Sequence, residues 1–119
     1  MISATLVTGA NAAVREAGIA RAIDPALATV ILLEGLASGR AELEALAGRV
    51  PLEVIRIAPG CPCCSGNLVF RVSLNRILRR PPAQLYISLA SPLHLEKIRR
   101  FLSAPPYDTW LQLNQELQT

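Results

Sequence analysis

The chain has 119 residues and a formal net charge of +3, with 51% hydrophobic, 18% charged and only 4% aromatic residues. This length allows one domain, and the aliphatic content excludes a disordered chain and favours helices packed on a sheet over a β-sandwich. No apolar run approaches the roughly 18 residues that a membrane span needs, so we expect no membrane partner. No basic segment precedes an apolar core at the N-terminus, so we expect a cytoplasmic protein without a signal peptide.

Apolar runs alternate with helical patterns along the chain. Short clusters of Val, Ile and Leu predict buried strands at residues 2–7 and 28–33. An alternating pattern predicts a strand at 52–57, and a further strand is expected at 84–89. Apolar residues at helical spacing predict helices at 12–23, 40–47, 67–80 and 92–102. The segment 107–113 fits either a strand or a helix. Strands that each precede a helix predict an α/β fold, a three-layer, mostly parallel sheet with helices on both faces.

Two of these helices have faces whose burial can be predicted. In 12–23 the polar face, which we expect to lie in solvent, consists of Arg15, Glu16 and Arg21. In 67–80 we expect an apolar stripe made of Leu68, Val72, Leu74, Ile77 and Leu78. We expect one domain over residues 1–119, in which 105–119 forms an edge strand or an interaction tail.

The loops after the strands are the candidate site. In parallel sheets, ligands bind at the carboxyl ends of the strands, which all lie at one edge. The loops that this topology gathers there span 8–13, 34–39, 59–66 and 90–92. Any ligand-binding residues are therefore expected in these four loops.

The second half of the chain is basic. Between Arg71 and Arg100 there are seven cations and one acid, Glu96. Such a region can meet phosphate or nucleic acid, or it can place arginines at helix C-termini, where they favour the helix dipole. Because no aromatic residues alternate with these cations to stack on bases, we favour the second interpretation and expect no nucleic-acid partner.

All three cysteines lie within four residues, at Cys61, Cys63 and Cys64. Without an export signal they are not expected to form a disulfide framework. As thiolates they can bind a thiophilic ion such as zinc or copper(I). Cys61 and Cys64 alone form a Cys-x-x-Cys pair that can cycle as a disulfide, and all three can also be small packed residues without chemistry.

A closed zinc site needs four donors, and three cysteines supply only three. The candidates for the fourth are His94, Glu34, a thiol from another chain or water. His94 can equally be a solvated surface residue, and Glu34 can simply be the polar end of a strand.

The stretch 60–68 (GCPCCSGNL) resembles the GCxCC motif of the CobW-type P-loop GTPases. Three further segments are similar to family segments in the expected order: 6–9 (LVTG), 33–35 (LEG) and 89–92 (LASP). The resemblance covers most of residues 2–102. It implies a P-loop NTPase-like fold, a metal bound at the cysteine motif with Glu34 as a candidate ligand, and a nucleotide site at Thr8 and Gly9.

The phosphate loop departs from the family pattern G-x-x-x-x-G-K-[ST]. Residues 9–16 read GANAAVRE, so Val14, Arg15 and Glu16 stand where Gly, Lys and Ser or Thr are expected. A β-branched residue disfavours the loop geometry, and a carboxylate repels phosphate. No N-K-x-D guanine motif follows and the chain is shorter than a full GTPase domain, so we expect no GTP hydrolysis and do not expect GTP as a cofactor.

We therefore interpret the chain as a truncated, degenerate relative that keeps the scaffold and the cysteine loop. The first hypothesis is a non-catalytic domain that binds zinc and acts as a metal-handling or regulatory accessory to a client protein. One alternative is a homodimeric protein-interaction module without metal, which pairs sheet edges or buries Trp110. Another is residual nucleotide binding without hydrolysis, through Thr8, Gly9, Asn11 and Arg15.

Overall fold

The computed structural model describes residues 1–35, 43, 51–57 and 65–119. Its strands are β1 (Ile2–Thr8), β2 (Thr29–Glu34), β3 (Leu52–Ile57), β4 (Gln84–Ser88), β5 (Leu111–Leu113) and β6 (Leu117–Gln118). Its helices are α1 (Ala12–Ala22), α3 (Ser65–Arg79), the short 3₁₀ helix η1 (Pro92–His94), α4 (Leu95–Ser103) and α5 (Tyr107–Trp110).

The strands form one sheet in the order β3-β2-β4-β1-β5, and β6 pairs with the second half of β1. Every strand pair is parallel. Strand β4 lies between β1 and β2, with Leu85 opposite Ala4 on one side and Val30 on the other. All five residues of β4 are buried, as expected for a central parallel strand.

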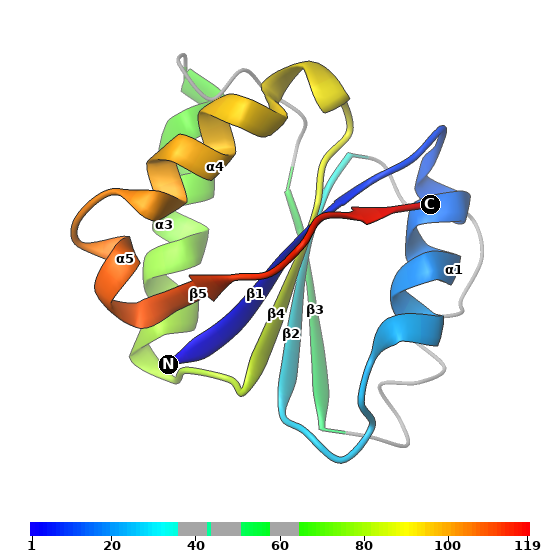
Figure 1. Cartoon of the computed structure of the whole chain (residues 1–119), viewed down its shortest axis with the longest axis horizontal. Helices are drawn as coiled ribbons and strands as arrows, with labels where there is room; N and C mark the ends of the chain where they lie inside the picture. The colour runs from blue at the N-terminus through cyan, green and yellow to red at the C-terminus, as the bar shows by residue number, and fades with distance from the viewer. Residues whose placement is uncertain (36–42, 44–50, 58–64) are drawn as a thin grey trace.

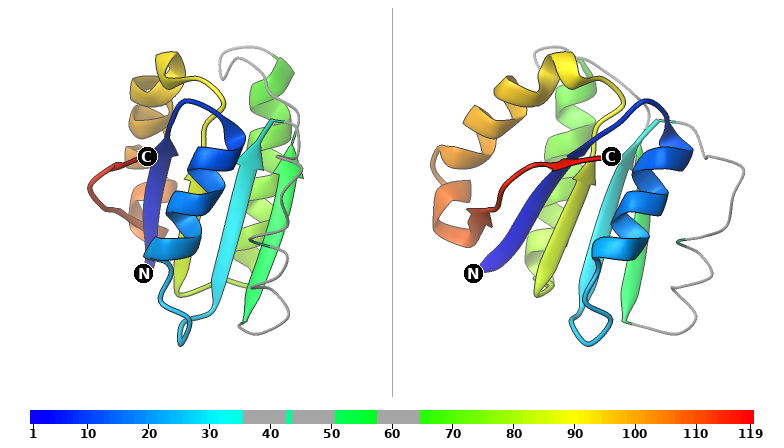
Figure 2. Two further views of the ribbon diagram at one scale, coloured as in Figure 1. Left: turned by 90° about the vertical axis from the view of Figure 1, so that its right-hand side faces the viewer. Right: turned by 45° about the vertical axis from the view of Figure 1, so that its right-hand side comes forward.

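Helices cover both faces of the sheet, so the expected three-layer α/β fold is confirmed (Figures 1 and 2). On one face, Ile19 of α1 packs with Val7, Ile31 and Tyr86. On the other, α3 and α4 contribute Phe70, Leu74, Ile77, Ile98 and Leu102 to a larger cluster with the remaining strand residues. Alternate residues of β1, β2, β3 and β4 therefore enter opposite cores.

Local signals set several element boundaries. The side chain of Asn11 caps α1, where its Oδ1 accepts a hydrogen bond from the Val14 amide at 2.9 Å. Ser91 caps η1 in the same way, and Pro92 occupies the first helical position. Gly35, with φ of +117°, ends β2 in a conformation that disfavours other residues.

The C-terminal region is divided into more elements than the sequence predicts. Residues 107–113 are both a helix and a strand, because α5 ends at Trp110 and β5 begins at Leu111. The predicted helix 92–102 opens as a 3₁₀ turn, and β6 was not predicted. The predicted helix 40–47 lies outside the described residues except for Leu43, which is buried.

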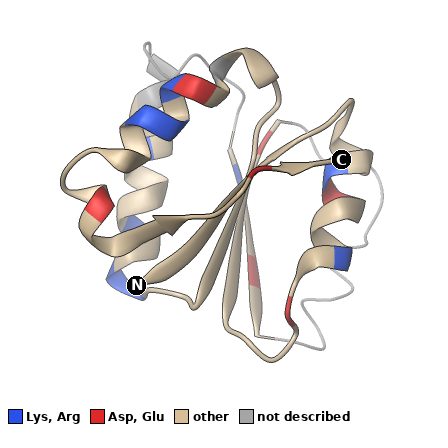
Figure 3. Cartoon of the chain, in the orientation of Figure 1, with Lys and Arg blue, Asp and Glu red and all other residues tan. Residues whose placement is uncertain are grey.

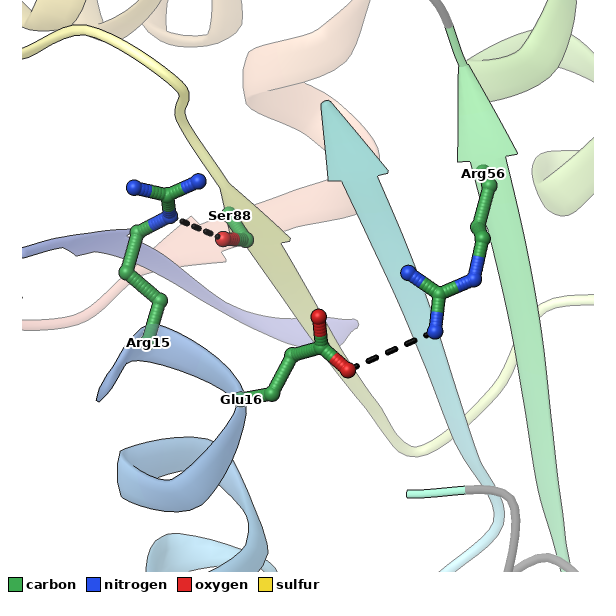
Figure 4. Close-up of polar contacts among 4 residues, drawn as sticks. All are labelled: Arg15, Glu16, Arg56 and Ser88. Carbon is green, nitrogen blue, oxygen red and sulfur yellow. Dashed lines mark hydrogen bonds and ion pairs between the residues drawn. The ribbon is translucent and has the colours of Figure 1, made fainter. Parts of the chain in front are cut away.

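The expected polar face of α1 is wrong for two of its three residues. Arg15 and Glu16 are buried, and only Arg21 is exposed. The Arg15 Nε donates a hydrogen bond to the Ser88 Oγ at 2.9 Å, and the Glu16 carboxylate forms an ion pair with Arg56 at 3.3 Å (Figure 4). The two charges are buried because β4 and β3 supply partners for them.

The apolar stripe predicted for α3 is correct in its second half and wrong in its first. Leu74 and Ile77 are buried and Leu78 is partly buried, whereas Leu68 is 65% and Val72 51% exposed. Phe70 takes the buried position in the first half. Figure 3 shows that cations follow α3 and α4, which cover the same face of the sheet.

Within the described part of the chain, no helix has the length and apolar character to cross a membrane.

Substitution of Leu85 by Ala tests the importance of β4. Leu85 is fully buried in the central strand, so Leu85→Ala should lower the free energy of unfolding by about 3 kcal/mol, through lost burial and a cavity. Urea denaturation measures this change. The matched control is Leu93→Ala, because Leu93 is 85% exposed and its loss should change stability by less than about 0.5 kcal/mol. An equal loss in the free energy of unfolding for the two substitutions would contradict the placement of Leu85 in the core.

Substitution of Arg15 by Met tests whether its buried hydrogen bonds stabilise the fold. Met keeps much of the aliphatic stem but leaves the Ser88 hydroxyl without its donor, so Arg15→Met should lower the free energy of unfolding by about 2 kcal/mol. Arg21→Met is the control, since Arg21 lies exposed on the same helix. The same urea titration measures both variants. Equal free energies of unfolding for Arg15→Met and Arg21→Met would show that the buried guanidinium contributes no net stability.

Candidate functional site

The connections that follow β1 and β4 lead to opposite faces of the sheet. The connection after β1 leads to α1 on one face of the sheet, whereas the connection after β4 leads to α4 on the other face. Adjacent strands whose connections diverge in this way form a topological switch point, which is where α/β sheets bind ligands. The predicted nucleotide residues Thr8, Gly9, Asn11 and Arg15 all lie at the end of β1 or in the first turn of α1, next to this switch point.

Arg15, which aligns with the phosphate-loop lysine, binds groups of the protein itself. Its Nε donates to the Ser88 Oγ, and its NH1 donates to the Gly9 carbonyl oxygen at 3.2 Å. The residue is only 4% exposed, and burial lowers the pKa of its guanidinium, opposed by the carboxylates of Glu16 and Glu34. The guanidinium is therefore held between the first turn of α1 and the end of β4.

The last residues of the chain cover the end of β1. The Thr119 amide and hydroxyl both donate to the Thr8 carbonyl oxygen, at 2.9 and 2.8 Å. The Thr8 hydroxyl in turn donates to the Glu116 carboxylate at 2.7 Å, and that carboxylate lies 3.8 Å from the guanidinium of Arg99. Figure 1 shows the C-terminus beside α1. Thr8 thus has both its carbonyl and its hydroxyl engaged by the chain itself.

Gly9 has no room for a side chain, because of the same C-terminal segment. A Cβ at Gly9 would overlap the Thr119 side chain, and a Cβ at Gly18 would meet the same residue. Gly9 does not have a positive φ, so its glycine is explained by this close approach rather than by an unusual backbone conformation.

Glu34 lies at the end of β2, directly opposite Ile57 of β3. Its Oε1 accepts a hydrogen bond from the Ala90 amide at 2.9 Å, and this bond joins the ends of β2 and β4. A second link, from the Gly35 amide to the Ile57 carbonyl oxygen at 2.9 Å, joins β2 to β3. Glu34 is therefore fixed at the carboxyl edge, next to the strand that leads into the cysteine segment.

The three predicted thiol ligands, Cys61, Cys63 and Cys64, fall within 58–64, outside the described residues. The backbone of His94 belongs to η1, but its side chain also lies outside the description. Among the residues that are described, no three His, Cys, Asp or Glu side chains come together as a metal site. The structure thus brings Thr8, Gly9, Arg15 and Glu34 to one edge of the sheet.

Three residues at this edge were not predicted from the sequence, namely Ser88, Glu116 and Thr119. A serine at the end of a buried apolar strand is a recognisable signal, since its hydroxyl needs a partner there. The other two lie in a polar tail without periodicity. Only the pairing of β6 with β1 brings that tail to Thr8.

One curated protein shares sequence with this chain. The zinc chaperone YeiR of Escherichia coli (strain K12) is 37% identical to it over 62 residues, which are 51% of this chain. The match covers 19% of that protein, so the chain spans about a fifth of the length of the curated relative it matches.

No family model matches the chain, and no solved structure matches it. The partial identity to YeiR supports a CobW-type relationship, as the resemblance of the sequence implied. The fold is consistent with that relationship, because it has the mostly parallel sheet and the three layers of a P-loop-like domain.

Proposed function

We propose that this chain is a non-catalytic, metal-handling domain of CobW type that binds zinc through Cys61, Cys63 and Cys64. The observation that carries the proposal is the presence of three thiols within four residues, in the connection from β3 to α3. Thiolate sulfur is the donor that zinc and other thiophilic ions prefer. The partial identity to a protein named a zinc chaperone supports zinc as the metal.

Glu34 is a suitable fourth donor because of its position in the sheet. It is paired with Ile57, and Cys61 follows Ile57 by four residues. Four residues span at most about 14 Å, so the covalent chain allows the thiols to reach the carboxylate. A carboxylate oxygen completes many zinc sites. His94, at the start of the next connection along the edge, is the competing donor.

The nucleotide part of the family's chemistry is not included in this proposal. Arg15 is engaged with Ser88 and the Gly9 carbonyl, and Glu16 adds a buried carboxylate where phosphate chemistry needs a hydroxyl. These contacts support a domain that handles metal without hydrolysing GTP. Its role would be that of an accessory which holds or transfers zinc.

The cysteines are tested by measuring bound zinc. We expect about one zinc ion per chain in the reduced protein and none when all three cysteines are changed to Ser, because a hydroxyl is a far weaker zinc ligand than a thiolate. Elemental analysis after exhaustive dialysis gives both values. The control is Ser103→Ala, an exposed position at the end of α4.

Equal, substoichiometric zinc in the parent and the triple Ser variant would refute the proposal. A metal-free protein that forms a Cys61–Cys64 disulfide under mild oxidant would instead support redox cycling of the pair.

The fourth donor is tested by replacing Glu34 with Gln. The amide oxygen of Gln can still accept from the Ala90 amide, so the edge of the sheet is preserved while the negative charge is lost. If Glu34 is a ligand, zinc affinity should fall about 10-fold or more in a competition titration with a chelator. The matched control is Glu53→Gln, an exposed carboxylate at the other end of β3. Unchanged affinity in Glu34→Gln, together with a loss in His94→Gln, would assign the fourth position to His94.

A further inference from the structure

At the amino edge of the sheet, opposite the edge that carries Thr8, Arg15 and Glu34, three hollows lie around the C-terminal end of α3. Each of them shares a lining residue with each of the other two. Arg79 lines the first and second, Arg80 the second and third, and Pro81 the first and third. We call these hollows together the arginine groove. It shares no residue with the Thr8, Arg15 and Glu34 site at the other edge.

One part of the arginine groove is apolar. The hollow there has a volume of about 510 Å³ and lies between Leu78, Pro81 and Trp110, with Met1 at its border. Trp110 is 47% exposed, although an indole ring is one of the most favourable side chains to bury. An exposed tryptophan beside an apolar hollow is typical of a surface that becomes covered in a complex.

The other part of the arginine groove is strongly cationic. Arg76, Arg79 and Arg80 line the adjoining hollow, and all three are exposed. None of them forms an ion pair with another residue in the part of the chain that the structure describes. The one carboxylate among the described lining residues is Glu53, and α3 contains no acid at all. Figure 3 shows this blue region at the end of α3.

The helix dipole accounts for part of this pattern. Cations in the last turn of α3 are favoured by the partial negative charge of the helix C-terminus, which explains the basic residues there. It does not explain why an apolar hollow with a half-exposed Trp110 adjoins them. The combination of an apolar hollow and unpaired guanidinium groups is complementary to a segment that carries both apolar and acidic side chains.

We propose that the arginine groove binds an extended acidic segment of a partner protein. One apolar side chain of that segment fills the hollow beside Trp110, and its carboxylates pair with Arg76, Arg79 and Arg80. A guanidinium can bind a carboxylate through two parallel hydrogen bonds, which favours carboxylates as the partner groups. Nucleic acid fits less well, since stacking on bases requires several aromatic side chains and the described lining residues include one, Trp110. This proposal does not depend on zinc binding.

The test uses a fluorescein-labelled synthetic peptide in which Leu and Trp are spaced among Asp and Glu. Fluorescence anisotropy should show saturable binding to the full chain that weakens as salt is added. A peptide with the same apolar residues among Asn and Gln should bind at least about 10-fold more weakly. Arg79→Glu, which reverses the charge of one cation in the groove, should lower the affinity for the acidic peptide about 10-fold. Trp110→Ala should lower it by a similar factor.

The matched control is Arg21→Glu, which changes the net charge by the same amount at an exposed position of α1 on the other face of the sheet. It should alter the peptide affinity by less than about twofold, because screening at moderate salt removes distant charge effects. Since Arg79 is exposed, Arg79→Glu keeps the proposal testable even if Trp110→Ala fails to fold.

Three results would overturn the proposal. One is equal weakening by Arg21→Glu and Arg79→Glu, which would show attraction to net charge alone. Another is tighter binding of a single-stranded oligouridine than of the acidic peptide, together with loss of oligouridine binding in Arg79→Glu. That result would make the groove a nucleic-acid site. The third is self-association in sedimentation that Trp110→Ala abolishes, which would assign the groove to a second copy of this chain.

Discussion

The structure depends on the burial of β4 between β1 and β2. A parallel strand that is paired on both edges and covered on both faces must consist of residues that tolerate full burial, and all five residues of Gln84–Ser88 are buried. Because parallel neighbours need crossovers, the chain places α1 on one face and α3 and α4 on the other. The same arrangement brings the carboxyl ends of β1, β2 and β4 to one edge. The connections after the neighbouring strands β1 and β4 diverge to opposite faces there. The candidate site is a consequence of this topology.

At the carboxyl ends of β1 and β4, the polar groups are engaged by the protein itself. A buried guanidinium is costly unless it is hydrogen-bonded, and Ser88 with the Gly9 carbonyl meets that requirement for Arg15. Asn11 occupies one of the first free amides of α1, and Thr119 engages the carbonyl of Thr8. In a phosphate loop the corresponding donors remain available for the ligand. Arg15, the Val14 amide and the Thr8 carbonyl are therefore each engaged by the protein itself, and the proposed function depends on the thiols instead.

Much of the fold could be predicted from the sequence, because buried strands and helix faces leave periodic patterns. The four apolar runs and the order of elements predicted the α/β sheet. The burial of Arg15 could not be predicted, since its partner Ser88 lies 73 residues away and a helical pattern cannot reveal which segment will cover a polar face. Strand β6 is only two residues long and polar at one of them, so it carries no periodic signal. For the site, the thiolate chemistry inferred from the spacing of the cysteines stays a prediction, whereas the position of Glu34 opposite Ile57 became known only from the register of β2 and β3.

The two edges of the sheet differ in how their charges are satisfied, and this difference separates their possible roles. At the carboxyl edge, two carboxylates are engaged in ion pairs, Glu16 with Arg56 and Glu116 with Arg99. At the amino edge, the guanidinium groups of α3 have no such partners among the described residues. Screening at physiological salt reduces the influence of one edge on the other, because a seven-residue strand such as β1 separates them by about 20 Å and the Debye length is about 8 Å. If both proposals hold, a partner can remain bound at the arginine groove while zinc enters or leaves at the opposite edge.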